Sequence, residues 1–149
     1  MNAESRLREL VAAHLSDNHT VDGIQFIDHL LSLTFEVGEI ECSLADEGKL
    51  RFRIPTQPVC EVELERAKAK LRLLCARLGV LCHESGDPDV SLYGGQGRIK
   101  KEMSVPTSAT DIALAPRLGA LTQSRSPEWR VRFKNTSSEQ EFTIQRTAR

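Results

Sequence analysis

The chain has 149 residues, of which 40% are hydrophobic and 28% are charged. That length and balance allow residues 1–149 to fold as a single domain without disulfides or metals, and they argue against wholesale disorder. The formal net charge of −1 provides no overall attraction for nucleic acid or for an anionic membrane, so composition argues against both as partners.

The charges are unevenly distributed along the chain. Residues 1–60 carry ten acidic and five basic side chains, whereas residues 61–149 carry eleven acidic and fifteen basic ones. Halves of opposite net charge can attract each other within one chain or between two copies of it.

Targeting and cofactor signals are absent from the sequence. The N-terminal segment is charged from its start, and no apolar run approaches the roughly eighteen residues of a membrane span. Cys42, Cys60, Cys75 and Cys82 form no Cys-x-x-Cys pair, so the sequence predicts no zinc site and no other metal or cofactor. We therefore expect a cytoplasmic protein with reduced cysteines.

Two helices are expected first. Leu7, Val11, His14 and Leu15 recur at helical spacing and form one stripe of the first helix, on which His14 is expected to be a satisfied core histidine. The second helix is predicted over residues 21–33, with Thr20 or Asp22 as its cap. Its apolar positions cover more than half of its circumference, which indicates deep burial or an oligomer contact.

The pattern then changes to strict alternation, which predicts a β-hairpin over residues 39–54. Asp46-Glu47-Gly48 suits a type I turn followed by a left-handed glycine. Folding about Glu47 pairs Cys42 with Phe52 on one face and Glu41 with Arg53 on the other.

A third helix is predicted from Pro58 to about residue 78, with Gly79 as its stop signal. Strands are expected over residues 80–83, 90–93 and 98–105, and residues 107–127 form an irregular segment. A last hairpin spans residues 129–147. With a four-residue loop it places Arg132 opposite Glu141 and Lys134 opposite Glu139.

These elements predict an α+β domain of two layers: two N-terminal helices, then one long central helix packed on a mostly antiparallel sheet built from hairpins. The apolar surface of the helix at 21–33 and the edges of an open sheet favour a homodimer.

Segment 94–101 is the main candidate for a ligand site. It joins a glycine-rich loop, residues 94–97, to a basic cluster; the candidate residues are Gly94, Gly95, Gln96, Gly97, Arg98, Lys100 and Lys101. Backbone N–H groups of such a loop, with cations nearby, can hold a phosphate. The competing interpretation, which the flanking strand patterns favour, is a plain hairpin in which Tyr93 pairs with Arg98.

The tripeptide Gly94-Gly95-Gln96 resembles the glutamine-bearing tripeptide of class I peptide-chain release factors and related peptidyl-tRNA hydrolases. The resemblance implies that Gln96 acts at an ester bond in the ribosome. It covers three of the 149 residues, and Leu92-Tyr93 before it and Gly97-Arg98-Ile99 after it depart from that family's pattern. The flanking residues therefore do not support a release-factor domain.

Two further groups have chemical potential. Cys82 and His83 are adjacent on a predicted strand, so they point to opposite faces and do not form a nucleophile–base pair. Arg130, Arg132 and Lys134 could form an RNA-binding row, but the aromatic residues between them alternate onto the other face, and Glu139 and Glu141 offset the charge. This row is interpreted as a solvated, ion-paired face.

The sequence contains no converging nucleophile, acid and base. It therefore favours a non-enzymatic binding or assembly protein that acts through protein–protein contacts. The alternative is a small-ligand protein, either a simple binder or an enzyme, that binds phosphate or nucleotide with the glycine-rich loop and its basic neighbours.

Overall fold

The computed structural model describes residues 2–16, 21–86, 90–100 and 127–147. Within these residues the protein has an α+β fold with three helices on one antiparallel six-stranded sheet. The helices are α1 (Ala3–His14), α2 (Gly23–Val37) and α3 (Ala67–Glu84). The strands are β1 (Glu39–Asp46), β2 (Lys49–Arg53), β3 (Cys60–Glu63), β4 (Gly94–Lys100), β5 (Glu128–Asn135) and β6 (Gln140–Arg146).

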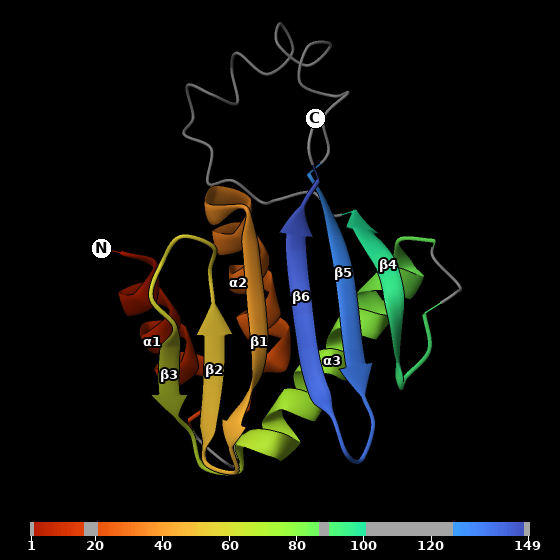
Figure 1. The fold of residues 1–149 in the computed structure, drawn as a ribbon. Coiled ribbons are helices and arrows are strands. Elements are labelled where there is room, and N and C mark those ends of the chain that lie inside the picture. Colours follow the sequence, from red (N-terminus) through yellow and green to blue (C-terminus); the bar gives the residue numbers. More distant parts are fainter. Residues whose placement is uncertain (1, 17–20, 87–89, 101–126, 148–149) are drawn as a thin grey trace, which may run out of the picture.

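The strand order is β3-β2-β1-β6-β5-β4, and every neighbouring pair is antiparallel. Each half of the sheet is a three-stranded unit, and the two units meet where β1 pairs with β6. All three helices lie behind the sheet in Figure 1, so the opposite face has no helical cover. The predicted two-layer α+β architecture is therefore confirmed.

The predicted hairpin at 39–54 is confirmed as β1 and β2, with Cys42 opposite Phe52 and Glu41 opposite Arg53. The turn differs from the prediction: Asp46 pairs with Lys49, so the loop has two residues, and Gly48 is not left-handed. Asp46 stabilises this loop because its carboxylate accepts a hydrogen bond from the Gly48 N–H at 2.8 Å.

The helix predicted at 21–33 is longer than expected and ends at Gly38, whose φ of +97° closes it. Asp22 caps its start by accepting a hydrogen bond from Gln25 N at 2.9 Å. Of the apolar residues that suggested an oligomer contact, Ile24 is exposed, and the others are buried within the chain itself: Phe26, Ile27, Leu30, Leu31 and Leu33. The wide apolar surface of α2 is thus explained by packing against α1, α3 and the sheet.

The helix predicted at 58–78 is wrong at both ends. Residues 60–63 form strand β3, because Cys60 and Val62 are buried while Glu61 and Glu63 alternate with them toward solvent. Glu61 forms an ion pair with Arg51 of β2 at 3.1 Å. Helix α3 continues through Gly79 to Glu84, so the strand predicted at 80–83 is its last turn.

The last hairpin is present, but its predicted register is wrong. Lys134 lies opposite Glu141, and Arg132 lies opposite Thr143. The loop still has four residues and starts one residue later than expected. This register pairs Phe133 with Phe142 on the helix-covered face, where both are buried. Packing of those two rings, rather than the surface charges, accounts for the register.

The predictions for the stretch between α3 and β5 have mixed outcomes. Residues 91–93 form a tight turn closed by a hydrogen bond from Ser91 N to Gly94 O at 3.1 Å, not the predicted strand. Residues 101–105 and the irregular segment 107–127, except Pro127, lie outside the described residues. No helix within the described ranges is long and apolar enough to cross a membrane.

Candidate binding face of the sheet

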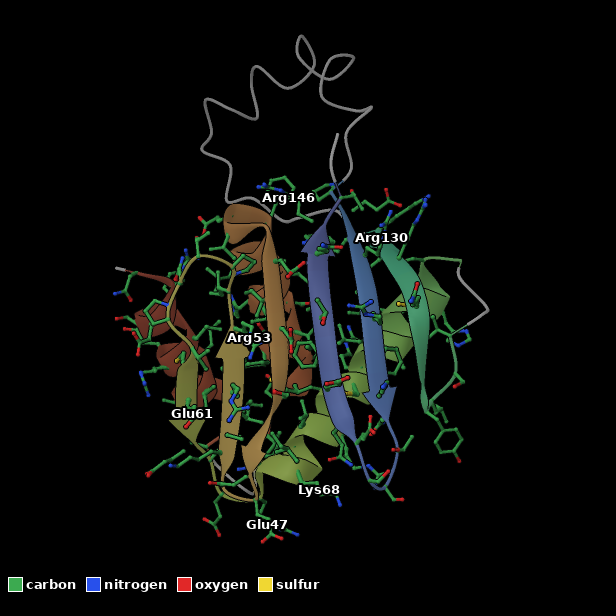
Figure 2. All side chains as sticks on the ribbon, viewed as in Figure 1. Glu47, Arg53, Glu61, Lys68, Arg130 and Arg146 are labelled. Carbon is green, nitrogen blue, oxygen red and sulfur yellow. The ribbon has the colours of Figure 1, made fainter. Side chains whose placement is uncertain are left out.

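The uncovered face of the sheet carries charged side chains in rows along the strands. Because strand side chains alternate between faces, the buried residues of each strand point to the helices and the intervening ones point away. Figure 2 shows Arg53 on β2 and Arg130 on β5 at this uncovered face. Strand β1 contributes carboxylates here, whereas β2 and β5 contribute cations.

A hollow of about 290 Å³ runs along β6 on this face, and we call it the β6 groove. Its polar lining comes from β1, β6, β5 and β4: Glu39, Glu41, Thr143, Gln145, Arg130, Arg132 and Gln96. A neighbouring hollow extends it toward Lys134 and Glu141. The groove therefore has an acidic wall on β1, a basic wall on β5 and an uncharged floor on β6.

Sheet register aligns the groove residues in two parallel rows. In one row Glu41 lies opposite Thr143, which lies opposite Arg132. In the other, Glu39 lies opposite Gln145, which lies opposite Arg130. Each row thus runs from a carboxylate through a neutral polar side chain to a guanidinium.

The charged groups of the groove differ in how they are paired. The Gln145 amide donates to the Glu39 carboxylate at 2.6 Å. Glu41, Arg130 and Arg132, in contrast, make no hydrogen bond or ion pair through their side chains with any described residue. Within the described part of the chain, no side chain therefore pairs with these three charges of the groove.

The glycine segment is not a hairpin tip. Residues 94–100 form strand β4, which pairs along its length with β5 and places Gly94 opposite Lys134. The predicted pairing of Tyr93 with Arg98 is therefore wrong, and Tyr93 is an exposed residue of the preceding turn. The strand pattern arises because β5 supplies the pairing partners, which lie 28 to 40 residues away in sequence.

The predicted site residues are divided between the two faces of β4. Gln96, Arg98 and Lys100 are exposed on the uncovered face, whereas Gly97 is buried on the other. Gln96 lines the β6 groove opposite Arg132, and Arg98 lies opposite Arg130. Lys101 lies outside the described residues.

This placement determines which groups of β4 can reach a ligand. The N–H groups of a strand point alternately to its two edges, so Gly94, Gly95 and Gly97 do not form a nest of converging donors. An anion at β4 would be held by the side chains of Gln96 and its basic neighbours. The tripeptide that ends in Gln96 is part of the same paired strand.

The aromatic residues of β5 lie where the sequence predicted. Trp129 and Phe133 are buried on the helix-covered face, and the Trp129 Nε1–H donates to Leu31 O of α2 at 3.0 Å. They are not available to stack on nucleic-acid bases. The cations of β5 therefore stand on the uncovered face without exposed aromatic neighbours on that strand.

Sequence reasoning missed the acidic wall and the floor of the groove. The sequence pattern places Glu41 on the outward face of a hairpin, and it assigns no role to Glu39, Thr143 or Gln145. Their only signal is the alternation that puts them on the polar face of β1 and β6. Nothing local in the sequence indicates that these two strands pair.

The cysteines lie in the core, away from the groove. None of the four forms a disulfide, and all four side chains are buried. Burial raises the pKa of Cys75 to about 12 and that of Cys42 well above its usual range. Both thiols therefore stay protonated near neutral pH and are poor nucleophiles.

The raised pKa of Cys75 predicts a loss of stability in alkali. Above pH 9 the unfolded thiol loses its proton while the folded one keeps it, so the free energy of unfolding falls up to about pH 12. Each such thiol contributes a slope of at most about 1.4 kcal/mol per pH unit. Urea unfolding at pH 8 and pH 10.5 should show a shallower fall for Cys75→Ala than for wild type. Equal slopes in the two proteins would contradict the prediction.

None of the three histidines that the structure describes lines the groove. His14 of α1 is partly buried, and its ring stacks on that of His29 with centroids 5.4 Å apart. His83 lies in the last turn of α3, where its Nε2 contacts Val90 O at 2.6 Å, and neighbouring Cys82 is buried. The predicted strand with Cys82 and His83 on opposite faces is therefore wrong: both residues lie in the last turn of α3, with Cys82 buried and His83 exposed.

A search for metal-binding groups and two comparisons with known proteins complete the description of the site. Among the described residues, no group of three or more His, Cys, Asp and Glu side chains is arranged to hold a metal ion. The chain matches no protein-family model and no curated protein, so the geometry of the uncovered face is the basis for a functional assignment.

Proposed function

We propose that this chain is a non-enzymatic binding protein that docks a protein partner on the uncovered face of its sheet. The main support for this proposal is the β6 groove, where Glu41, Arg130 and Arg132 have no partner among the described residues. Acidic groups of a partner would pair with Arg130 and Arg132, whereas Arg98 already pairs with Glu128 of β5 at 3.7 Å.

Several features favour binding over catalysis. The groove side chains are carboxylates, amides, guanidiniums and one hydroxyl, that of Thr143. No histidine lines the groove, and Lys134, which lines the adjoining hollow with Thr143, is ion-paired with Glu139 at 3.3 Å. The thiols that could serve as nucleophiles are protonated and buried elsewhere. Because these cysteines form no disulfide, we also assign the protein to the reducing cytoplasm.

A homodimer is part of the proposal and would leave the groove accessible. It would use apolar side chains on the outer surface of the helices, where Ile24, Leu73 and Val80 are each more than 40% exposed. Leu73 and Val80 are seven residues apart and share one side of α3. Gly23, next to Ile24, packs against Leu73.

Photo-crosslinking in cells that express the protein tests both the partner contact at the groove and the homodimer contact at the helices. A benzoylphenylalanine at position 143 should yield an adduct with a partner protein, and one at position 73 an adduct of twice the chain mass. Adding Arg132→Glu should lower the yield at 143 about fivefold, which corresponds to one exposed charge pair. The matched control is Lys68→Glu on α3, an exposed cation outside the groove, which should leave the yield unchanged.

The outcomes separate this proposal from its alternatives. No adduct at position 143, or equal yields in both charge variants, would contradict docking on the groove. The phosphate or nucleotide alternative relies on the cluster of Gln96, Arg98 and Lys100 beside Arg130. It predicts instead that inorganic phosphate or nucleotides raise the melting temperature and that Lys100→Ala removes the effect.

A further inference from the structure

The two walls of the β6 groove have opposite charge and the same spacing. Glu39 and Glu41 are two residues apart on β1, and Arg130 and Arg132 are two residues apart on β5. In a strand that separation is about 6.7 Å. The walls are separated by β6 alone, so they stand about two strand spacings apart, roughly 9.5 Å.

An extended peptide has the matching geometry. Its side chains alternate between two sides, and those on one side repeat at the same distance of about 6.7 Å. A peptide lying along β6 would therefore direct every second side chain to the acidic wall and the others to the basic wall. Thr143 and Gln145 on the floor offer a hydroxyl and an amide for hydrogen bonds beneath it.

We propose that the β6 groove recognises an extended peptide segment in which acidic and basic residues alternate. The acidic side chains pair with Arg130 and Arg132, and the basic ones with Glu39 and Glu41. This inference rests on the proposed function and specifies the chemistry of the partner. Charge complementarity supports it, because the carboxylate wall repels a nucleic-acid backbone and the guanidinium wall repels a uniformly basic segment.

Two labelled octapeptides of identical composition test the alternation directly. One repeats Glu-Lys, so that all acids lie on one side of the extended chain and all bases on the other. The second repeats Glu-Glu-Lys-Lys, which places both charges on each side. Fluorescence anisotropy at low ionic strength should give about fivefold tighter binding of the alternating peptide, and added salt should reduce the difference.

A charge exchange within one row should reverse this preference. The double variant Glu41→Arg/Arg132→Glu gives each wall one acid and one base, which is the pattern that the Glu-Glu-Lys-Lys peptide presents. We expect the variant to bind that peptide about fivefold more tightly than the alternating one. Lys68→Glu is the control and should keep the wild-type order, and circular dichroism should verify that both variants are folded.

Equal affinity for the two peptides, no binding of either, or an unchanged order in the double variant would overturn the inference. Tighter binding of a single-stranded oligonucleotide than of either peptide would do the same and would indicate a polyanion surface. These results are distinguishable from failure of the proposed function. An Arg132-dependent adduct at position 143 without peptide discrimination would retain the protein partner and reject only its alternating charge.

Discussion

Replacing Trp129 with alanine is expected to lower the free energy of unfolding by about 3–5 kcal/mol, the largest effect of any single change considered for β5. The side chain is fully buried, its Nε1–H donates to Leu31 O at 3.0 Å, and its ring meets the edge of Phe35. The alanine variant would leave a cavity where β5 packs on α2 and would remove the hydrogen bond between them. Urea unfolding monitored by circular dichroism measures the loss.

Two variants on the same strand serve as controls. Trp129→Phe keeps an aromatic ring and loses the indole N–H, so we expect a smaller loss of about 1–2 kcal/mol. Arg130→Ala, the next residue, changes the opposite face and should alter stability by no more than about 0.5 kcal/mol. A Trp129→Ala protein as stable as Arg130→Ala would mean that β5 presents its aromatic face to solvent.

Gly94→Ala is expected to cost about 3 kcal/mol for two combined reasons. The residue has a φ of +143°, a backbone angle that residues other than glycine rarely adopt. A Cβ at this position would also lie 2.6 Å from Phe133 O on β5, an atom that cannot move without distorting the sheet. Glycine is required here because β4 approaches β5 closely where its pairing begins.

Two other glycines separate the strain from the clash. Gly86, which follows α3, has a φ of +88° and nothing within 4 Å of its added Cβ, so Gly86→Ala should cost about 1 kcal/mol. Gly48 has no positive φ and only Asp46 Oδ1 nearby, at 3.8 Å, so its alanine variant should lie within about 0.5 kcal/mol of wild type. Chemical denaturation of the three variants should give that order. Equal losses for Gly94→Ala and Gly86→Ala would remove the role assigned to close strand approach.

The prediction for Gly94 also defines the role of the glycine segment. Its conformational freedom is used to bring an edge strand against β5, which is a structural role. That pairing places Gln96 beside Arg132 in the groove and Arg98 beside Arg130. The segment therefore contributes to the candidate site through the side chains that the glycines position, while the ligand role of Gly94, Gly95 and Gly97 stays a prediction.

Local patterns predicted the fold best where neighbouring parts of the chain pair with each other. The β1–β2 hairpin could be predicted because alternation, a short turn and the Glu41–Arg53 pair all indicate the same register. The error at residues 60–63 has a local cause as well. Pro58 followed by several glutamates is typical of a helix start, yet Cys60 and Val62 pair with Phe52 and Leu50 across β2. Tertiary pairing overrode the helix signal there.

By itself, the sequence determined the composition of the two faces. Its period-two pattern assigns apolar side chains to one side of β1, β2 and β5 and charged ones to the other, and this predicted both the α+β layers and the burial of Trp129 and Phe133. Only the tertiary structure decided which charged side chains meet. The pairing of β1 with β6 joins segments about a hundred residues apart, and no local pattern encodes so distant a contact. That single pairing brings Glu39 and Glu41 across from Arg130 and Arg132, and without it the groove does not exist.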